Sequence, residues 1–201
     1  MSLIFFLLVI IPSAILHEWA HGWAADRLGD PTPRLAGRLT LNPIPHIDPW
    51  GTLLMPLTLF FLTSGSFLFA YAKPVPFNPL ALRWQRWGGA AVGIAGPAMN
   101  LAVAAALGLV ARYIGPSIFA GYLGIVVYAN LLLAVFNLVP VPPLDGSHIL
   151  FAILPDRFYP LKVWLQRYGF WALIVVLFGF SWFAGPLLQV LFRLATGFSL
   201  G

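Results

Sequence analysis

The chain has 201 residues, of which 60% are hydrophobic and only 8% are charged. Soluble domains carry roughly 25% charged residues, so the composition excludes an ordinary soluble protein and indicates one integral membrane domain over residues 1–201. The net charge of +5 comes from single basic residues in short loops, which is typical of membrane orientation in a lipid bilayer and not of nucleic-acid binding. There is no cysteine, which excludes disulfides and thiolate metal sites.

The first apolar run extends from about Ser2 to Ala25. A membrane helix needs about 20 residues, so we predict that this run spans the membrane. No Lys or Arg precedes Arg27, so the run lacks the basic region of a signal peptide, and we expect it to be retained.

The last third of this run contains an H-E-x-x-H pattern, His17-Glu18-Trp19-Ala20-His21, and Glu18 is the only glutamate in the chain. On a helix, His17 and His21 share one face and can bind one metal ion, and Glu18 can act as the general base towards a metal-bound water. The three side chains could instead face a polar seam between helices. In a membrane span they need partners, and a divalent ion would satisfy all three at once.

Two segments precede the third apolar run. Residues 26–50 form a loop with five prolines, in which Leu35–Leu41 could be a short strand. The run 51–72 is interrupted by Pro56 and by the polar stretch Thr63–Ser66. If this run crossed the membrane, the basic residues would divide five against six. If the run instead returns near Thr63–Ser66, nine basic residues lie on one side of the membrane and two on the other, which is the positive-inside pattern. We therefore predict a re-entrant segment, an external N-terminus, and a site towards the cytoplasmic side.

Further apolar runs follow at 88–110, 117–139 and 169–195, and a Pro-rich turn occupies 140–150. The sequence therefore predicts an all-α polytopic membrane protein with about four full transmembrane helices, one re-entrant segment and short helices. Small β-hairpin or strand elements could lie at its cytoplasmic side.

Zinc needs a third protein ligand and leaves a fourth position for water. Asp145 is favoured because it lies in a Pro-rich break between apolar stretches, where the preceding span ends on the side at which the first span ends. His148 could contact the ligand shell or be an interfacial surface histidine. His46 could act as a gate or as a reversible extra ligand. The other acids are Asp26, Asp30, Asp48 and Asp156.

Three motifs together resemble the site-2 protease family of intramembrane zinc metalloproteases. They are HEWAH at 17–21, GPAMN at 96–100 and NLVPVPPLDG at 137–146. The resemblance covers nearly the whole chain, including the segments LNPIPHIDPWG and AKPVPFNP, and it favours a compact prokaryotic branch without PDZ-like or cystathionine-synthase-like domains. Asn100 of the second motif is expected to be structural and not catalytic.

The resemblance implies that His17, His21 and Asp145 bind Zn²⁺ and that Glu18 activates the water. It also implies that Asn137 helps to hold the substrate backbone or the oxyanion, and the less favoured alternative is a helix-terminal cap. The implied reaction is hydrolysis of a peptide bond in or near a transmembrane segment of a membrane protein, in the inner membrane of a prokaryotic cell.

Two points stay open. The substrate could pair as a strand with Arg34–Leu41 or Lys73–Phe77. The alternative function is a non-proteolytic membrane metal-binding or ion-transport protein, since intramembrane acids and histidines also mark ion pathways. The internal repeats frequent in transporters are not visible in the sequence.

Overall fold

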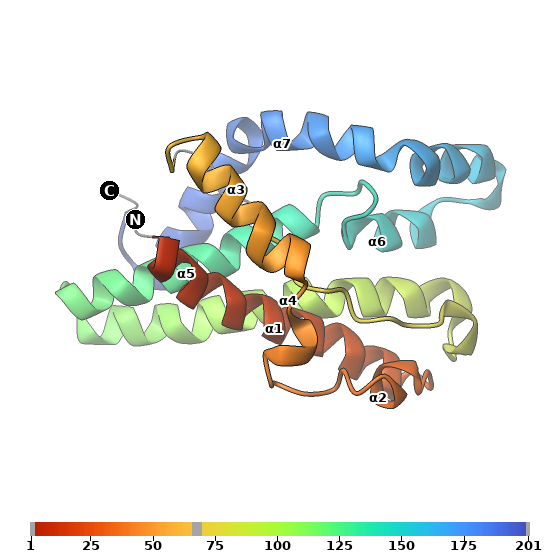
Figure 1. Ribbon diagram of the computed structural model, residues 1–201, viewed down its shortest axis with the longest axis horizontal. Helices are drawn as coiled ribbons and strands as arrows, with labels where there is room; N and C mark the ends of the chain where they lie inside the picture. Colours follow the sequence, from red (N-terminus) through yellow and green to blue (C-terminus); the bar gives the residue numbers. More distant parts are fainter. Residues whose placement is uncertain (1–2, 66–69, 200–201) are drawn as a thin grey trace.

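The computed structural model describes residues 3–65 and 70–199, and every regular element in these ranges is helical (Figure 1). The long helices are α1 (Leu3–Arg27), α4 (Gln85–Ile114), α5 (Ile118–Asn137) and α7 (Tyr159–Thr196). The short helices are α2 (Thr32–Leu35), α3 (Met55–Leu62) and α6 (Gly146–Ile153), with single turns of 3-10 or π-helix at Ile44–His46, Pro49–Leu54, Pro79–Ala81 and Asp156–Phe158.

Three helical stretches within the described residues are long and apolar enough to cross a membrane, namely Arg86–Ile114, Ile118–Asn137 and Asp156–Phe180. Helix α1 has 25 residues and carries the HEWAH motif near its C-terminal end. The protein is therefore an all-helical integral membrane protein that crosses the bilayer several times, as the composition predicts.

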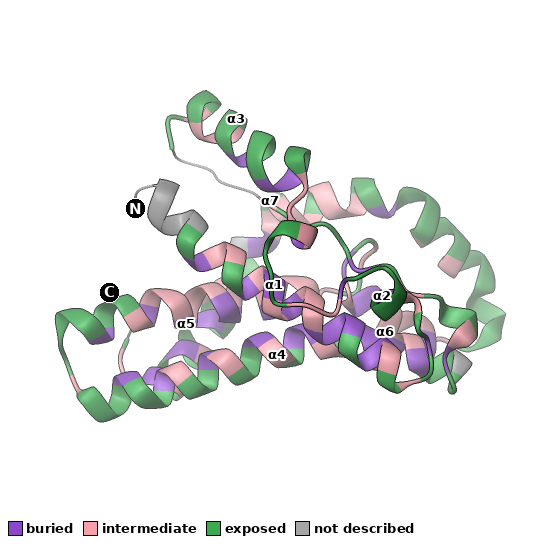
Figure 2. Ribbon diagram, turned by 60° about the horizontal axis from the view of Figure 1, so that its bottom comes forward, coloured by how far each residue is buried: buried purple, intermediate pink, exposed green. Residues whose placement is uncertain are grey.

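The main apolar core lies where α4, α5 and α7 meet, and α1 packs against α4 and α5 (Figure 2). Small residues of α4 allow close helix packing, since a Cβ on Gly108 would lie 2.8 Å from the Cβ of Ala195 in α7. The stretch Asp156–Phe180 is much less buried, which suits a surface facing lipid. The main apolar cluster consists of Ala104, Val127, Leu131, Phe180, Ala184, Leu188 and Phe192.

The segment 51–72 leaves the bundle and returns to its starting point. Helix α3 carries the chain out, and a turn with positive φ at Ser64 (51°) and Gly65 (77°) reverses it. Part of the predicted hinge, Ser66, lies outside the described residues. The N–H of Tyr71 then donates to the carbonyl of Gly51 at 3.1 Å, so the two ends of the segment lie side by side. A Cβ on Gly51 would overlap the Tyr71 ring, so this return requires glycine.

The strand predicted over Leu35–Leu41 is wrong. Leu35 ends α2, and Gly37 takes a positive φ of 66° in the turn that follows. Proline at the start of α2 has a φ suited to a helix, and positive φ at Gly37 is incompatible with an extended chain. Residues 71–78 belong to no helix or strand, and no β-ladder forms within the described ranges. Pro74 and Pro76 have no N–H to donate to such a ladder.

Candidate metal centre

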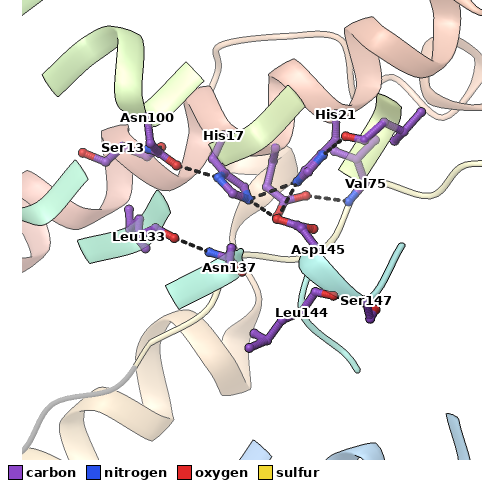
Figure 3. A network of polar contacts seen from close by, with 12 residues as sticks. Ser13, His17, His21, Val75, Asn100, Leu133, Asn137, Leu144, Asp145 and Ser147 are labelled. Atoms are coloured by element: carbon purple, nitrogen blue, oxygen red, sulfur yellow. Dashed lines mark hydrogen bonds and ion pairs between the residues drawn. The ribbon is translucent and has the colours of Figure 1, made fainter. Parts of the chain in front are cut away.

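Helix α1 and the turn before α6 bring three candidate ligands together (Figure 3). His17 Nε2 lies 3.0 Å from Asp145 Oδ2, and His21 Nε2 lies 3.3 Å from the same oxygen. The two Nε2 atoms are 3.0 Å apart. Zinc lies about 2.0–2.2 Å from nitrogen and oxygen ligands, which places tetrahedral neighbours roughly 3.3 Å apart. The spacing therefore fits a small divalent cation bound by all three residues.

Protons on the imidazoles support this fit. His21 Nδ1 lies 2.7 Å from the carbonyl oxygen of Val92, which can only accept a hydrogen bond. His21 Nδ1 is therefore the protonated nitrogen, and in a neutral ring the Nε2 lone pair faces His17 and Asp145. Two imidazole nitrogens and a carboxylate oxygen that converge in a buried site are costly unless a proton or a metal cation lies between them. The donor set of two imidazoles and one carboxylate is one that Zn²⁺ prefers.

Helix α4 makes room for this centre by presenting bare backbone. A Cβ on Gly96 would lie 2.6 Å from His17 Nε2 and closer still to His21 Nε2. A Cβ on Gly93, one turn earlier, would lie 2.9 Å from the carbonyl oxygen of Asp145. The two glycines thus let both α1 and the Asp145 turn approach α4, and any side chain at Gly96 would fill the space between the imidazoles.

The Asp145 turn is fixed by its own backbone. Helix α5 ends at Asn137 because the prolines that follow cannot continue it. The chain turns back so tightly that a Cβ on Gly146 would overlap the carbonyl of Leu138. Ser147 then donates from its backbone N–H and its hydroxyl to the carbonyl of Leu144, at 3.0 and 2.7 Å. These contacts start α6 and hold Asp145, the residue immediately before this helix, towards α1.

Comparisons with known proteins agree with this geometry. The family model "Peptidase family M50" matches residues 113–179. The chain is 36% identical to "Putative zinc metalloprotease YwhC" of Bacillus subtilis over an alignment of 183 residues. This alignment covers 86% of this chain and 79% of that protein. The chain belongs to peptidase family M50. This is the site-2 protease family, so the resemblance read from the motifs is confirmed, as are a zinc metalloprotease activity and Zn²⁺ as cofactor.

Other M50 relatives are proteins named "Putative zinc metalloprotease Rip2". The one from Mycolicibacterium smegmatis is 30% identical over 179 residues, which cover 86% of this chain and 67% of that protein. The one from Mycobacterium tuberculosis is 35% identical over 140 residues, which cover 67% of this chain and 51% of that protein. No solved structure matches the chain.

Glu18 lies beside the cluster and is held by the backbone of a distant segment. Its Oε2 accepts a hydrogen bond of 2.8 Å from the N–H of Val75. Asn137, the last residue of α5, donates from Nδ2 to the carbonyl of Leu133 at 2.9 Å. Glu18 thus follows His17 directly in α1 and is oriented by Val75, and the Asn137 amide nitrogen is turned towards its own helix.

His46 and His148 lie outside the three-residue cluster. His46 is only 1% exposed, and its Nε2 lies 2.9 Å from the carbonyl oxygen of Thr40, so that nitrogen is a donor in a loop. The His148 ring packs edge-on against Phe77, with ring centroids 5.7 Å apart. Neither His46 nor His148 therefore lies where it could bind the same metal ion as the three clustered residues.

Asp30 and Asp48 organise loops. Asp48 Oδ1 accepts from the N–H groups of Trp50 and Gly51, as expected of a turn former. Asp30 is fully buried and accepts from the hydroxyl and N–H of Thr32 and from the N–H of Asn78. Burial opposes the charge of Asp30, but these hydrogen bonds outweigh it and hold the pKa of the carboxyl below its usual value.

The sequence analysis missed Ser13 and Asn130. Both are buried, and both belong to a chain of hydrogen bonds that ends on His17. A signal existed for Asn130, because it is a single amide in the middle of the apolar helix α5. A polar side chain inside a membrane span is a functional candidate until a partner explains it.

Proposed function

We propose that this M50 zinc metalloprotease hydrolyses a peptide bond in or near a transmembrane segment of a membrane protein substrate. The observation that carries the proposal is the convergence of His17, His21 and Asp145, at 3.0–3.3 Å, inside a bundle of apolar helices. These three residues hold Zn²⁺ in the proposal. Residues 1–201 act as one membrane-embedded protease domain.

The proposed topology has four spanning helices and one re-entrant segment. Helix α1 joins the three apolar helical stretches as the fourth span, since its 25 residues give about 38 Å of helix. The hydrogen bond between Tyr71 and Gly51 supports the return of the segment 51–72 to the side it left. The charge distribution of the loops then favours a site on the cytoplasmic side of a prokaryotic inner membrane.

Zn²⁺ held by His17, His21 and Asp145 would supply Lewis-acid activation of the attacking water and of the scissile carbonyl. Glu18 is the proposed general base. Its carboxylate removes a proton from the attacking water and then delivers a proton to the leaving amine nitrogen, which balances the hydrolysis. The Val75 N–H orients this carboxylate through Oε2.

Asn137 is the proposed donor to the oxyanion. Its amide nitrogen carries two hydrogens, and the bond to the Leu133 carbonyl uses one of them. The second hydrogen is then free to donate to the oxygen of the scissile carbonyl as negative charge develops there. One such donor contributes about 3 kcal/mol to an acyl-transfer transition state.

A helical substrate must unwind before its carbonyl can react. The segment 71–78, which belongs to no helix, is the proposed docking edge, and in the proposal it is extended. The N–H groups of Tyr71 and Lys73 already donate to carbonyls of the protein, and that of Val75 donates to Glu18. Alternate residues of an extended chain face opposite edges, and Pro74 and Pro76 have no N–H. The free edge therefore offers carbonyl acceptors, and an unwound substrate would bind it through its own N–H groups.

The test is to purify the protein in detergent, measure bound zinc, and follow cleavage of a membrane-helix substrate. We expect about one zinc per chain, cleavage by the wild type, and retained zinc with lost cleavage in Glu18→Gln. Asp156→Asn removes an exposed carboxylate elsewhere and serves as the matched control, with cleavage unchanged. Zinc binding without cleavage in the wild type, or full cleavage by Glu18→Gln, contradicts the proposal.

A further inference from the structure

A chain of buried polar side chains leads away from the metal centre into the bundle. It joins Ser13 of α1, Asn130 of α5 and Asn100 of α4, and it ends on His17. Figure 3 shows its last contact, between Asn100 and His17. Asn100 and Asn130 are fully buried, and Ser13 is 4% exposed. Buried amides among apolar helices need hydrogen-bond partners, and these supply one another.

Backbone carbonyls fix the direction of both amides. Asn100 Nδ2 donates to Asn130 Oδ1 at 2.8 Å and to the carbonyl of Ser13 at 3.3 Å. Asn130 Nδ2 donates to the carbonyl of Val126 at 2.9 Å and to the Ser13 hydroxyl at 3.0 Å. A carbonyl oxygen can only accept, so each amide must turn its nitrogen towards the backbone partner.

The orientation of the Asn100 amide determines which nitrogen of His17 carries the proton. With its nitrogen committed, Asn100 turns Oδ1 towards His17 Nδ1, at 2.5 Å. An amide oxygen only accepts, so His17 Nδ1 carries the proton and Nε2 keeps its lone pair. A flipped Asn100 would set a donor against Nδ1 and favour the opposite tautomer, whose protonated Nε2 cannot bind a metal.

We propose that Asn130 and Asn100 are positioning residues that hold His17 in the tautomer able to bind zinc. The inference rests on the proposed role of His17 as a ligand. His21 needs no such device, because the Val92 carbonyl fixes its tautomer directly. The tautomer of His17 is instead fixed by the side-chain amide of Asn100, which could rotate. Asn130 prevents this rotation because its Oδ1 accepts a hydrogen bond from the Asn100 nitrogen. Partners that orient a ligating histidine typically change metal affinity about 10- to 100-fold.

The experiment measures zinc affinity by competition with a chelator, for the full chain in detergent. The variants are Asn100→Leu, Asn130→Leu and the double variant, since leucine has a similar size and no polar atoms. We expect a loss of about 10- to 100-fold for Asn100→Leu. Asn130→Leu should lose less, about threefold or more, because Asn100 keeps its bond to the Ser13 carbonyl.

The decisive comparison is the double variant. If Asn130 acts through Asn100, adding Asn130→Leu to Asn100→Leu should change zinc affinity by less than about twofold. Thr196→Val is the matched control, because it removes a fully buried hydroxyl that bonds to the Phe192 carbonyl in α7. It should keep wild-type zinc affinity, even if its thermal stability falls.

Three results would overturn the inference or separate it from the proposed function. A folded Asn100→Leu variant with wild-type zinc affinity overturns the relay, and so does an effect of Asn130→Leu that is equal in both backgrounds. A wild-type chain that binds no zinc contradicts the proposed function itself. If Asn100→Leu does not fold, the smaller Asn100→Ala takes its place in the same comparison.

Discussion

Glu18 and Val75 are joined by a hydrogen bond of 2.8 Å, from the backbone N–H of Val75 to the Glu18 carboxylate. Val75 lies in the segment 71–78, which belongs to no helix and is held by several hydrogen bonds. Lys73 donates to the carbonyl of His46 and accepts from the Arg38 guanidinium, and Asn78 donates to Asp30. The orientation of the proposed general base is therefore set by loop residues far from it in sequence.

The anchor at Asp30 predicts a loss of stability on truncation. Asp30→Ala would remove the carboxylate that accepts from the N–H of Asn78 and from the N–H and hydroxyl of Thr32. Hydrogen bonds to a charged group contribute about 1.5–3 kcal/mol each, and water can replace part of this loss because Asn78 is exposed. We therefore expect a loss of roughly 2–3 kcal/mol in unfolding free energy. Denaturant unfolding in detergent would measure it, with the exposed Asp156→Ala as control. Equal stability of the two variants would contradict the role of Asp30 as an anchor.

The same anchor predicts a specific dependence on pH. The pKa of Asp30 is lowered in the folded protein: burial acts against its charge, but hydrogen bonds from Thr32 and Asn78 outweigh burial. The stabilisation is therefore fully present above the usual pKa of 3.8 and is lost as the pH falls below it towards the lower folded value.

Wild type and Asp30→Asn should be compared by unfolding at several pH values between about 3 and 7. The difference in stability between them should be largest near neutral pH and shrink below about pH 4, because asparagine has no charge to lose. Comparing the two chains cancels the effect of other carboxyls. A difference that does not change with pH would show that the Asp30 charge contributes nothing.

Much of the site could be predicted from the sequence, because metal ligands are a few residue types that occur at characteristic spacings. The helical i, i+4 spacing of His17 and His21 and the Pro-rich break before Asp145 each carry a recognisable signal. The hydrogen bond from Val75 to Glu18 carries none, because any non-proline residue could supply that N–H. Asn130 had a signal, an amide in an apolar span, but nothing in the sequence indicated which residue it would contact.

The fold, like the site, has features that the sequence predicts and features that it does not. The apolar runs predicted long helices, since length and hydrophobicity decide what can span a membrane. The strand expected over Leu35–Leu41 was wrong, because the positive φ of Gly37 and the helical start at Pro33 depend on local backbone geometry. A stretch as short as Leu35–Leu41 does not discriminate between a strand and a turn by its residue pattern.

The close approach of α4 predicts that Gly96 cannot be replaced. In Gly96→Ala the new methyl would overlap the space between His17 Nε2 and His21 Nε2, so we expect zinc affinity to fall by about 100-fold or more. Gly89→Ala is the matched control on the same helix, because a Cβ there meets nothing within 4 Å. Chelator competition measures both variants. Wild-type affinity in Gly96→Ala would show that the imidazoles do not converge on one ion.

The proposed re-entrant segment predicts which loops share a side of the membrane. The chain has no cysteine, so single cysteines can be introduced and labelled without background. Three exposed positions suit this: Leu35 and Leu80 (each 81% exposed) flank the segment 51–72, and Tyr113 (93% exposed) lies at the end of α4. A thiol reagent that does not cross membranes would be applied to intact cells and to inverted vesicles.

If the segment 51–72 returns to the side it left, Leu35→Cys and Leu80→Cys should both be labelled in inverted vesicles and protected in intact cells. Tyr113→Cys should show the opposite pattern, because the span α4 separates it from Leu80. If the segment instead crosses the membrane, Leu35→Cys and Leu80→Cys must differ, and Leu35→Cys must agree with Tyr113→Cys. The labelling pattern therefore decides between the two topologies, independently of zinc binding and of catalysis.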